Sequence, residues 1–149
     1  MSHITKMKLR VRDLDALETA ATECGLELVR DARSFKWFGR FVGDTTPPAG
    51  YDPKDYGKCE HKMRLKGASS SDYEIGIVAA KDGDGYDLLV DTWQQRRLMG
   101  AVGGAEMNKL RQEYATAVTM TRAAKLARQG YTARRENVNG RVRIHLVKR

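Results

Sequence analysis

The sequence is poor in the residues that mark secreted and membrane proteins. Only 2 of its 149 residues are cysteine, too few for a disulfide framework, which favours a reducing compartment. No stretch approaches the roughly 18 consecutive apolar residues of a membrane-spanning helix. The first residues also lack the apolar segment of a signal peptide. We therefore expect a cytoplasmic protein without membrane contact, folded as a single domain over residues 1–149.

Acidic residues are scarce in the last third of the chain. Residues 94–149 hold 13 Lys/Arg against 3 Asp/Glu, a net charge of +10, whereas residues 1–93 hold 14 against 16. Positive charge concentrated in one region is typical of proteins that bind polyanions. We expect nucleic acid or an acidic protein as the partner. The alternative is an ordinary solvated basic surface.

The C-terminal part has the most regular pattern. Apolar and small residues recur at helical spacing over residues 107–124, which predicts a long helix. Gly130 suits a left-handed C-cap because it has no Cβ. Asn139-Gly140 is typical of a tight turn between two strands. The sequence therefore predicts a helix followed by a closing β-hairpin.

The rest of the chain alternates strands with turns. We predict a short helix after Asp13, a further strand or hairpin arm in the aromatic residues 34–44, and an ordered excursion over residues 45–57, which hold all three prolines. Residues 94–104 read as a loop. Period-2 alternation predicts the remaining strands, at 3–11, 26–30, 58–66, 73–80 and 86–93.

These elements predict an α+β fold, an antiparallel sheet of about six or seven strands with two helices on one face. The order of helix, glycine and strand at Cys24-Gly25-Leu26 recurs at Gln129-Gly130-Tyr131. An alternative is therefore a sheet made of two pseudo-symmetric halves, each a strand, a helix and a hairpin.

Basic side chains alternate along several predicted strands. Because alternate residues of a strand share a face, one outer sheet face would carry Lys6, Lys8, Arg10, Lys62, Arg64, Arg141 and Arg143. Such charges bind phosphates, and Tyr73 or Trp93 would stack a base if exposed. Helix residues Arg111, Arg122, Lys125 and Arg128 add charge elsewhere. We predict a nucleic-acid-binding face, with charge that only keeps the strands soluble as the alternative.

Cys59 and His61 make a second candidate site. They are two residues apart on a predicted strand and would share a face. If His3 lies on a neighbouring strand, the three would converge, with Asp44 or Asp55 nearby. A thiol and imidazoles suit zinc or a Cys–His nucleophile pair. The alternative is a buried cysteine and a hydrogen-bonded core histidine.

Short motifs are spread over nearly the whole chain. They are Met1-Ser2-His3 with Asp13-Leu14-Asp15-Ala16-Leu17, Gly57-Lys58-Cys59-Glu60-His61, Tyr73–Val78, Tyr86–Trp93, and Gly130-Tyr131 with Asn139–Arg143. In this combination the sequence resembles the family called domain of unknown function 1257, which includes a plastid and cyanobacterial hypothetical reading frame and bacterial and phage proteins. The family has no assigned reaction, and its members often lie near genes for AAA-type ATPases. The resemblance implies a bacterial or phage protein that acts as a partner or adaptor.

The leading prediction is a non-catalytic basic module that binds nucleic acid or docks on a larger partner such as an AAA-type ATPase. No catalytic residue is predicted and no cofactor is expected. One alternative is a zinc protein or Cys/His-dependent enzyme at Cys59, His61 and His3. The other is a phage protein that binds or inhibits a host protein through the proline-containing excursion with Trp37, Phe38 and Tyr51.

Overall fold

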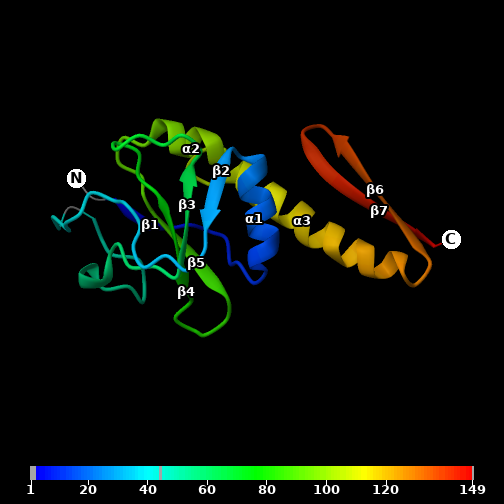
Figure 1. Ribbon diagram of the computed structural model, residues 1–149, viewed down its shortest axis with the longest axis horizontal. Coiled ribbons are helices and arrows are strands. Elements are labelled where there is room, and N and C mark those ends of the chain that lie inside the picture. Colours follow the sequence, from blue (N-terminus) through cyan, green and yellow to red (C-terminus); the bar gives the residue numbers. More distant parts are fainter. Residues whose placement is uncertain (1–2, 44, 149) are drawn as a thin grey trace.

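An antiparallel sheet of five strands forms the centre of the molecule. The computed structural model describes residues 3–43 and 45–148, so Met1, Ser2 and Asp44 of the motifs and sites above lie outside the described residues. Neighbouring strands follow the order β1-β5-β4-β3-β2 (Figure 1). The strands are β1 (Ile4–Lys6), β2 (Leu26–Val29), β3 (His61–Leu65), β4 (Ile75–Ala79) and β5 (Tyr86–Asp91).

Three helices cover one face of this sheet. They are α1 (Leu14–Glu23), α2 (Arg96–Val102) and α3 (Asn108–Ala127). Asp13 caps α1 by accepting a hydrogen bond from the backbone N–H of Ala16 at 3.0 Å. Leu17, Leu98 and Leu110, one from each helix, are fully buried in the main core. The predicted α+β class is confirmed.

Helix α2 lies within residues 94–104, for which the sequence predicts a loop. The three glycines at positions 100, 103 and 104 favour a loop, but Leu98 and Val102 are four residues apart and both fully buried. Packing of this pair against the core outweighs the low helix propensity of Gly100. Among the described residues, no helix is long and apolar enough to cross a membrane.

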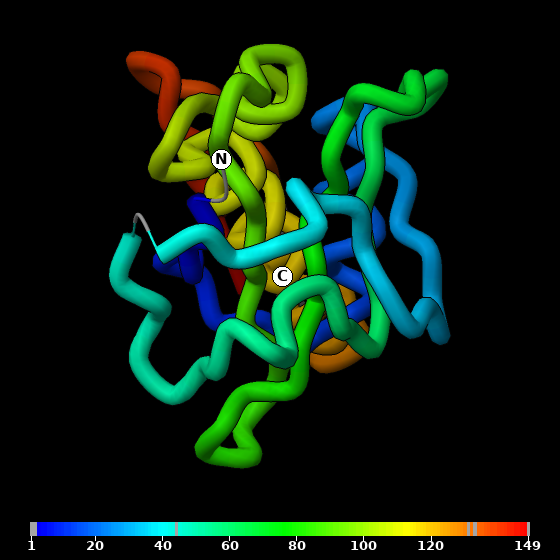
Figure 2. Tube along the Cα trace, turned by 90° about the vertical axis from the view of Figure 1, so that its left-hand side faces the viewer, coloured from blue at the N-terminus to red at the C-terminus, as the bar shows by residue number. Residues whose placement is uncertain are grey.

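The opposite face of the sheet is covered by residues 30–43 and 45–60. This segment crosses in front of the strands in Figure 2, and its helical turn is η1 (Pro53–Asp55). Its aromatic side chains make a second core, the outer cluster, which consists of Phe35, Tyr51 and Tyr56 with Ile4 and Leu89 of the sheet. The ordered excursion is confirmed. The strand predicted at residues 34–44 is wrong, since Ser34 makes only an isolated bridge to Lys58.

The C-terminal hairpin forms a sheet of its own. Strands β6 (Tyr131–Val138) and β7 (Arg141–Lys148) pair along their whole length and lie beside the second half of α3 (Figure 1). The seven strands therefore divide between two sheets. The join of helix, glycine and strand does recur, with Gly25 and Gly130 at positive φ. Within the described residues the two halves nevertheless share no sheet, because β6 and β7 pair with each other in a separate one.

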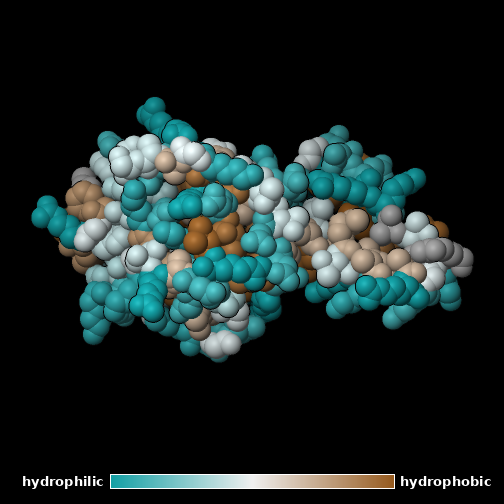
Figure 3. All heavy atoms as spheres, viewed as in Figure 1, coloured by the Kyte–Doolittle hydropathy of each residue, from teal (hydrophilic) through white to brown (hydrophobic). Residues whose placement is uncertain are grey.

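The hairpin and the end of α3 project from the main body as an arm. Figure 3 shows the body and the arm as two largely hydrophilic lobes. In the arm, apolar side chains lie between an upper and a lower hydrophilic region. An isolated hairpin is marginally stable in water. Here Arg135 of β6 pairs with Glu113 of α3 at 3.5 Å, and Val142 and Ile144 of β7 line a small cavity against α3. Contacts with α3 therefore support the hairpin.

We predict that Gly76→Ala destabilises the protein by about 1–3 kcal/mol. A Cβ at Gly76 would overlap the ring of Phe35 and push it out of the outer cluster. Gly100→Ala is the matched control, because nothing lies near its added Cβ and the position is helical. That change is expected to be neutral or to stabilise by up to about 1 kcal/mol. Urea denaturation measures both, and equal effects would contradict the packing of Phe35 on the sheet.

Candidate nucleic-acid interface

Two of the predicted contact residues are already neutralised on the outer sheet face. Lys62 pairs with Glu74 at 3.2 Å, and only 20% of its side chain is exposed. Arg64 pairs with Glu27 at 2.6 Å. Residues 30–43 and 45–60 cover part of the same face. The outer face is therefore no open basic surface.

Lys8 lies elsewhere because the first strand is interrupted. Strand β1 ends at Lys6, the N–H of Met7 still bonds to the carbonyl of Leu88 in β5 at 2.9 Å, and the chain rejoins β5 at Val11, which pairs with Tyr86. Between them the N–H of Leu9 bonds to the carbonyl of Met7 at 2.9 Å. This local turn breaks the alternation, so Lys8 lies beside α3. The guanidinium of Arg10 instead reaches Asp87 on the outer side of β5 and Asp82 in the β4–β5 turn. Lys6 keeps its predicted side, since it pairs with Leu89 of the outer cluster.

Arg141 and Arg143 are exposed on β7 of the arm. Because β7 pairs only with β6, these two arginines share no sheet with Lys6, Lys62 and Arg64. The prediction that all seven basic residues lie on one sheet face is thus wrong. Period-2 alternation gives the face of each residue within its own strand, but it does not say which strands are neighbours.

Cys59, His61 and His3 do not converge. His61 lies on the helix-covered face, where its Nδ1 accepts the N–H of Asp31 at 2.9 Å and its ring meets Tyr86. Cys59 precedes β3 and packs against the outer cluster on the other face. His3 contacts Trp93 beside β1, roughly three strand spacings, or 14 Å, from β3. Within residues 3–43 and 45–148 there is no group of three His, Cys, Asp or Glu arranged to hold a metal.

The aromatic residues of the excursion mostly face inward. Tyr51 is buried and donates its hydroxyl to Asp87 at 2.6 Å. Trp37 packs edge-on against Tyr56, and Phe38 is half-buried. The hypothesis of a host-protein surface would rest on the remaining exposure of these side chains.

A groove of about 960 Å³ runs between residues 8–13 and helix α3. Its apolar floor includes Leu9 and Val118. Four exposed cations line it and make no ion pair with any described residue: Lys8, Arg111, Arg122 and Lys125, called here the groove cations. The groove therefore concentrates positive charge that no carboxylate of the described chain neutralises.

The other charges of the groove are engaged within the protein. Arg10 pairs with Asp82 and Asp87 at 2.9 and 3.2 Å. Arg12 bonds to Asp84, which holds the pKa of that carboxyl below its usual range. The acidic residue lining the groove is Asp13, whose side chain caps α1. These ion pairs leave the groove cations as the charge available to a ligand.

Tyr114 fixes the width of the groove. Its hydroxyl accepts hydrogen bonds from the backbone N–H groups of Arg12 and Asp13 at 3.0 and 3.2 Å. Tyr114 belongs to α3, and its side chain is buried as part of the main core. One tyrosine therefore ties the segment that carries Lys8 to the helix that carries the other three groove cations.

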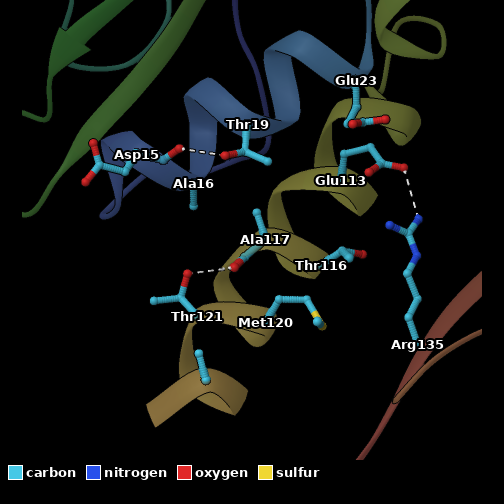
Figure 4. Close-up of a pocket in the computed structure, with 11 residues that line it drawn as sticks. Asp15, Ala16, Thr19, Glu23, Glu113, Thr116, Ala117, Met120, Thr121 and Arg135 are labelled. Carbon is cyan, nitrogen blue, oxygen red and sulfur yellow. Dashed lines mark hydrogen bonds and ion pairs between the residues drawn. The ribbon is translucent and has the colours of Figure 1, made fainter. Parts of the chain in front are cut away.

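The far side of α3 has a different character. A pocket of about 470 Å³ lies between α1, α3 and the arm (Figure 4). Asp15, Glu23 and Glu113 line it together with Met120 and alanines, and its arginine, Arg135, is paired with Glu113. Carboxylates repel phosphate, so the pocket is unsuited to a polyanion. Helix α3 thus separates an acidic side from a basic one.

The spacing of the basic residues in α3 predicts part of the groove from the sequence. Arg111, Arg122 and Lys125 are separated by 11 and 3 residues, which puts them within about 60° of one another on a helix of 3.6 residues per turn. Glu113 falls on the opposite side by the same arithmetic. The sequence alone therefore shows that these three cations share one face of the helix. It does not show that Lys8 lies beside them, because the turn after β1 determines the position of Lys8.

Comparison of the chain with protein-family models, curated proteins and solved structures finds no match. The resemblance described from the motifs therefore stays a prediction.

We predict that Cys59 reacts slowly in the folded protein. Burial raises the pKa of its thiol to about 11, so at pH 8 only about one molecule in a thousand holds the reactive thiolate. Iodoacetamide should alkylate Cys59 about 100-fold more slowly than free cysteine, measured by mass spectrometry on a Cys24→Ala protein. His61→Gln should leave the rate unchanged, because the two side chains lie on opposite faces. A rate that depends on His61 would instead support a Cys–His pair.

Proposed function

We propose that this protein is a non-catalytic module that binds nucleic acid through the groove cations. The observation that carries the proposal is their position: four exposed, unpaired cations line one groove, while Arg10, Arg12, Lys62 and Arg64 are held by carboxylates. Phosphate contacts of this kind supply most of the affinity of non-specific binding.

The spacing of the groove cations suits a nucleic-acid backbone. Fourteen residues separate Arg111 from Lys125 on α3, which is about 21 Å along the helix axis. One strand of a duplex advances about 3.4 Å per phosphate, so this length corresponds to about six nucleotides. Exposed arginines of the arm, including Arg141 and Arg143, would add long-range attraction.

An acidic protein surface, such as one on an AAA-type ATPase, would be attracted by the same charges. The two proposals separate in a pull-down with nuclease treatment, because a protein partner stays attached when nucleic acid is removed. The apolar floor beside the groove cations is compatible with both. The cations of α3 lie on one helix face over about 21 Å, a length that suits several consecutive phosphates and favours a nucleic acid.

We predict salt-dependent binding that depends on the groove cations. Fluorescence anisotropy with single-stranded DNA, duplex DNA and RNA at roughly 50 and 200 mM salt should show affinity falling steeply with salt. Changing Arg111, Arg122 and Lys125 together to alanine should weaken binding about tenfold or more. It should also reduce the slope of log K against log salt by about 2 to 3. Alanine is a good helix former, so the fold is expected to hold.

The matched control removes the same charge from elsewhere. Arg33, Arg64 and Lys66 are replaced together by alanine; none of them lines the groove. This variant should keep most of the affinity and most of the salt slope. Equal losses in the two variants would mean that only net charge matters, and an absence of binding at low salt would reject the proposed function.

A further inference from the structure

A second concave site lies beside the start of α2, away from the groove cations. It has a volume of about 640 Å³ and lies between the β3–β4 loop and the connection from β5 to α2. Tyr73 and Trp93, which are 20 residues apart in the sequence, both line it and both are half-buried. Arg96 and Arg97 line it as well. Aromatic rings beside arginines in a hollow of this size are the components of a base-stacking site.

Hydrogen bonds hold the walls of this site in place. The side chain of Gln95 is buried, and its Oε1 accepts the backbone N–H of Tyr73 at 2.8 Å. Trp93 is held by its backbone N–H, which bonds to the buried carboxylate of Asp91 at 3.1 Å. The ring of Trp93 also contacts that of His3 at a centroid distance of 5.0 Å. The backbone of both aromatic residues is therefore held by buried side chains, and the ring of Trp93 is held further by its contact with His3.

Of the two arginines that line the site, one forms an ion pair within the protein and the other is exposed to solvent. Arg97 pairs with the buried Asp72 at 3.0 Å. Arg96 is exposed and makes no ion pair with a described residue. It is thus available to a phosphate next to a stacked base, while Arg97 supports the wall.

Gln94 occupies a strained conformation in the same hollow. Its φ of 53° lies in the left-handed region that favours glycine. A turn held in this conformation commonly occurs at a functional site. Here it places an exposed amide residue, which can hydrogen-bond to a base edge, between Trp93 and the buried Gln95.

We propose that this site, the base pocket of Tyr73, Trp93, Gln94 and Arg96, binds an unstacked nucleobase with its phosphate. The inference rests on the proposed function and narrows it to single-stranded nucleic acid. Bases in a duplex are stacked on each other and cannot enter a pocket without being flipped out. The groove cations would hold the backbone of the strand, and the base pocket would add contacts that need a base.

The test compares two labelled strands with the same phosphates, a thymidine 12-mer and a 12-mer of abasic residues, by fluorescence anisotropy. The wild-type protein should bind the thymidine strand about 5- to 150-fold more tightly, the range expected for one stacked base. Trp93→Ala and Tyr73→Ala should each reduce this ratio toward one without weakening the abasic complex. Trp93→Phe is the matched control and should keep most of the ratio. Thermal melting confirms that each variant is folded.

The outcomes separate this inference from the proposed function. Equal affinity of the wild-type protein for both strands would overturn the base pocket and leave the groove cations in place. A preference for the thymidine strand that survives both alanine variants would overturn the assignment to Tyr73 and Trp93. Binding of neither strand would overturn both proposals. The groove triple variant should weaken both complexes and leave their ratio unchanged.

Discussion

The buried carboxylate of Asp91 holds three separate parts of the chain together. It is fully buried at the end of β5 and accepts the backbone N–H groups of His3, Phe38 and Trp93 at 3.0 to 3.1 Å. A buried carboxylate without such donors would destabilise the fold by several kcal/mol. The start of β1, the aromatic excursion and the turn before α2 are therefore fixed at one point. Glu74 and Asp87 act in the same way on the same face, where they bind Lys36, Lys62, Tyr51 and Arg10.

These carboxylates explain where the free positive charge lies. In the N-terminal part of the chain, about half of the cations form ion pairs, among them Arg10, Lys62 and Arg64 on or near the sheet. The C-terminal part has few carboxylates, so Arg111, Arg122 and Lys125 stay unpaired on α3. The uneven distribution of charge along the sequence thus produces an uneven distribution of charge on the surface. The groove cations lie on one side of α3, and the pocket lined by carboxylates in Figure 4 lies on the other.

Strand β5 links the two proposed sites. Asp87 pairs with Arg10 at the wall of the groove, and Asp91, four residues later, anchors Trp93 in the base pocket. Alternation puts both carboxylates on the outer side of the strand. A strand whose inner face packs the core therefore also orients a phosphate-binding region and an aromatic site. Phosphate contacts position a strand, and base contacts add selectivity.

The sequence by itself determined the elements whose pattern is local: the α+β class, the long helix, the hairpin, the glycine joins and the excess of positive charge. Helical and period-2 spacing encode which residues face inward, because side-chain direction repeats with the backbone. Tertiary structure alone decided which faces meet. The turn after Met7 moved Lys8 to α3, and the irregular residues before β3 separated Cys59 from His61. Residues 30–43 and 45–60 closed the outer face through contacts to Asp87 and Asp91, and the hairpin formed a sheet of its own. Each of these outcomes depends on contacts between residues far apart in the chain, which no local pattern contains.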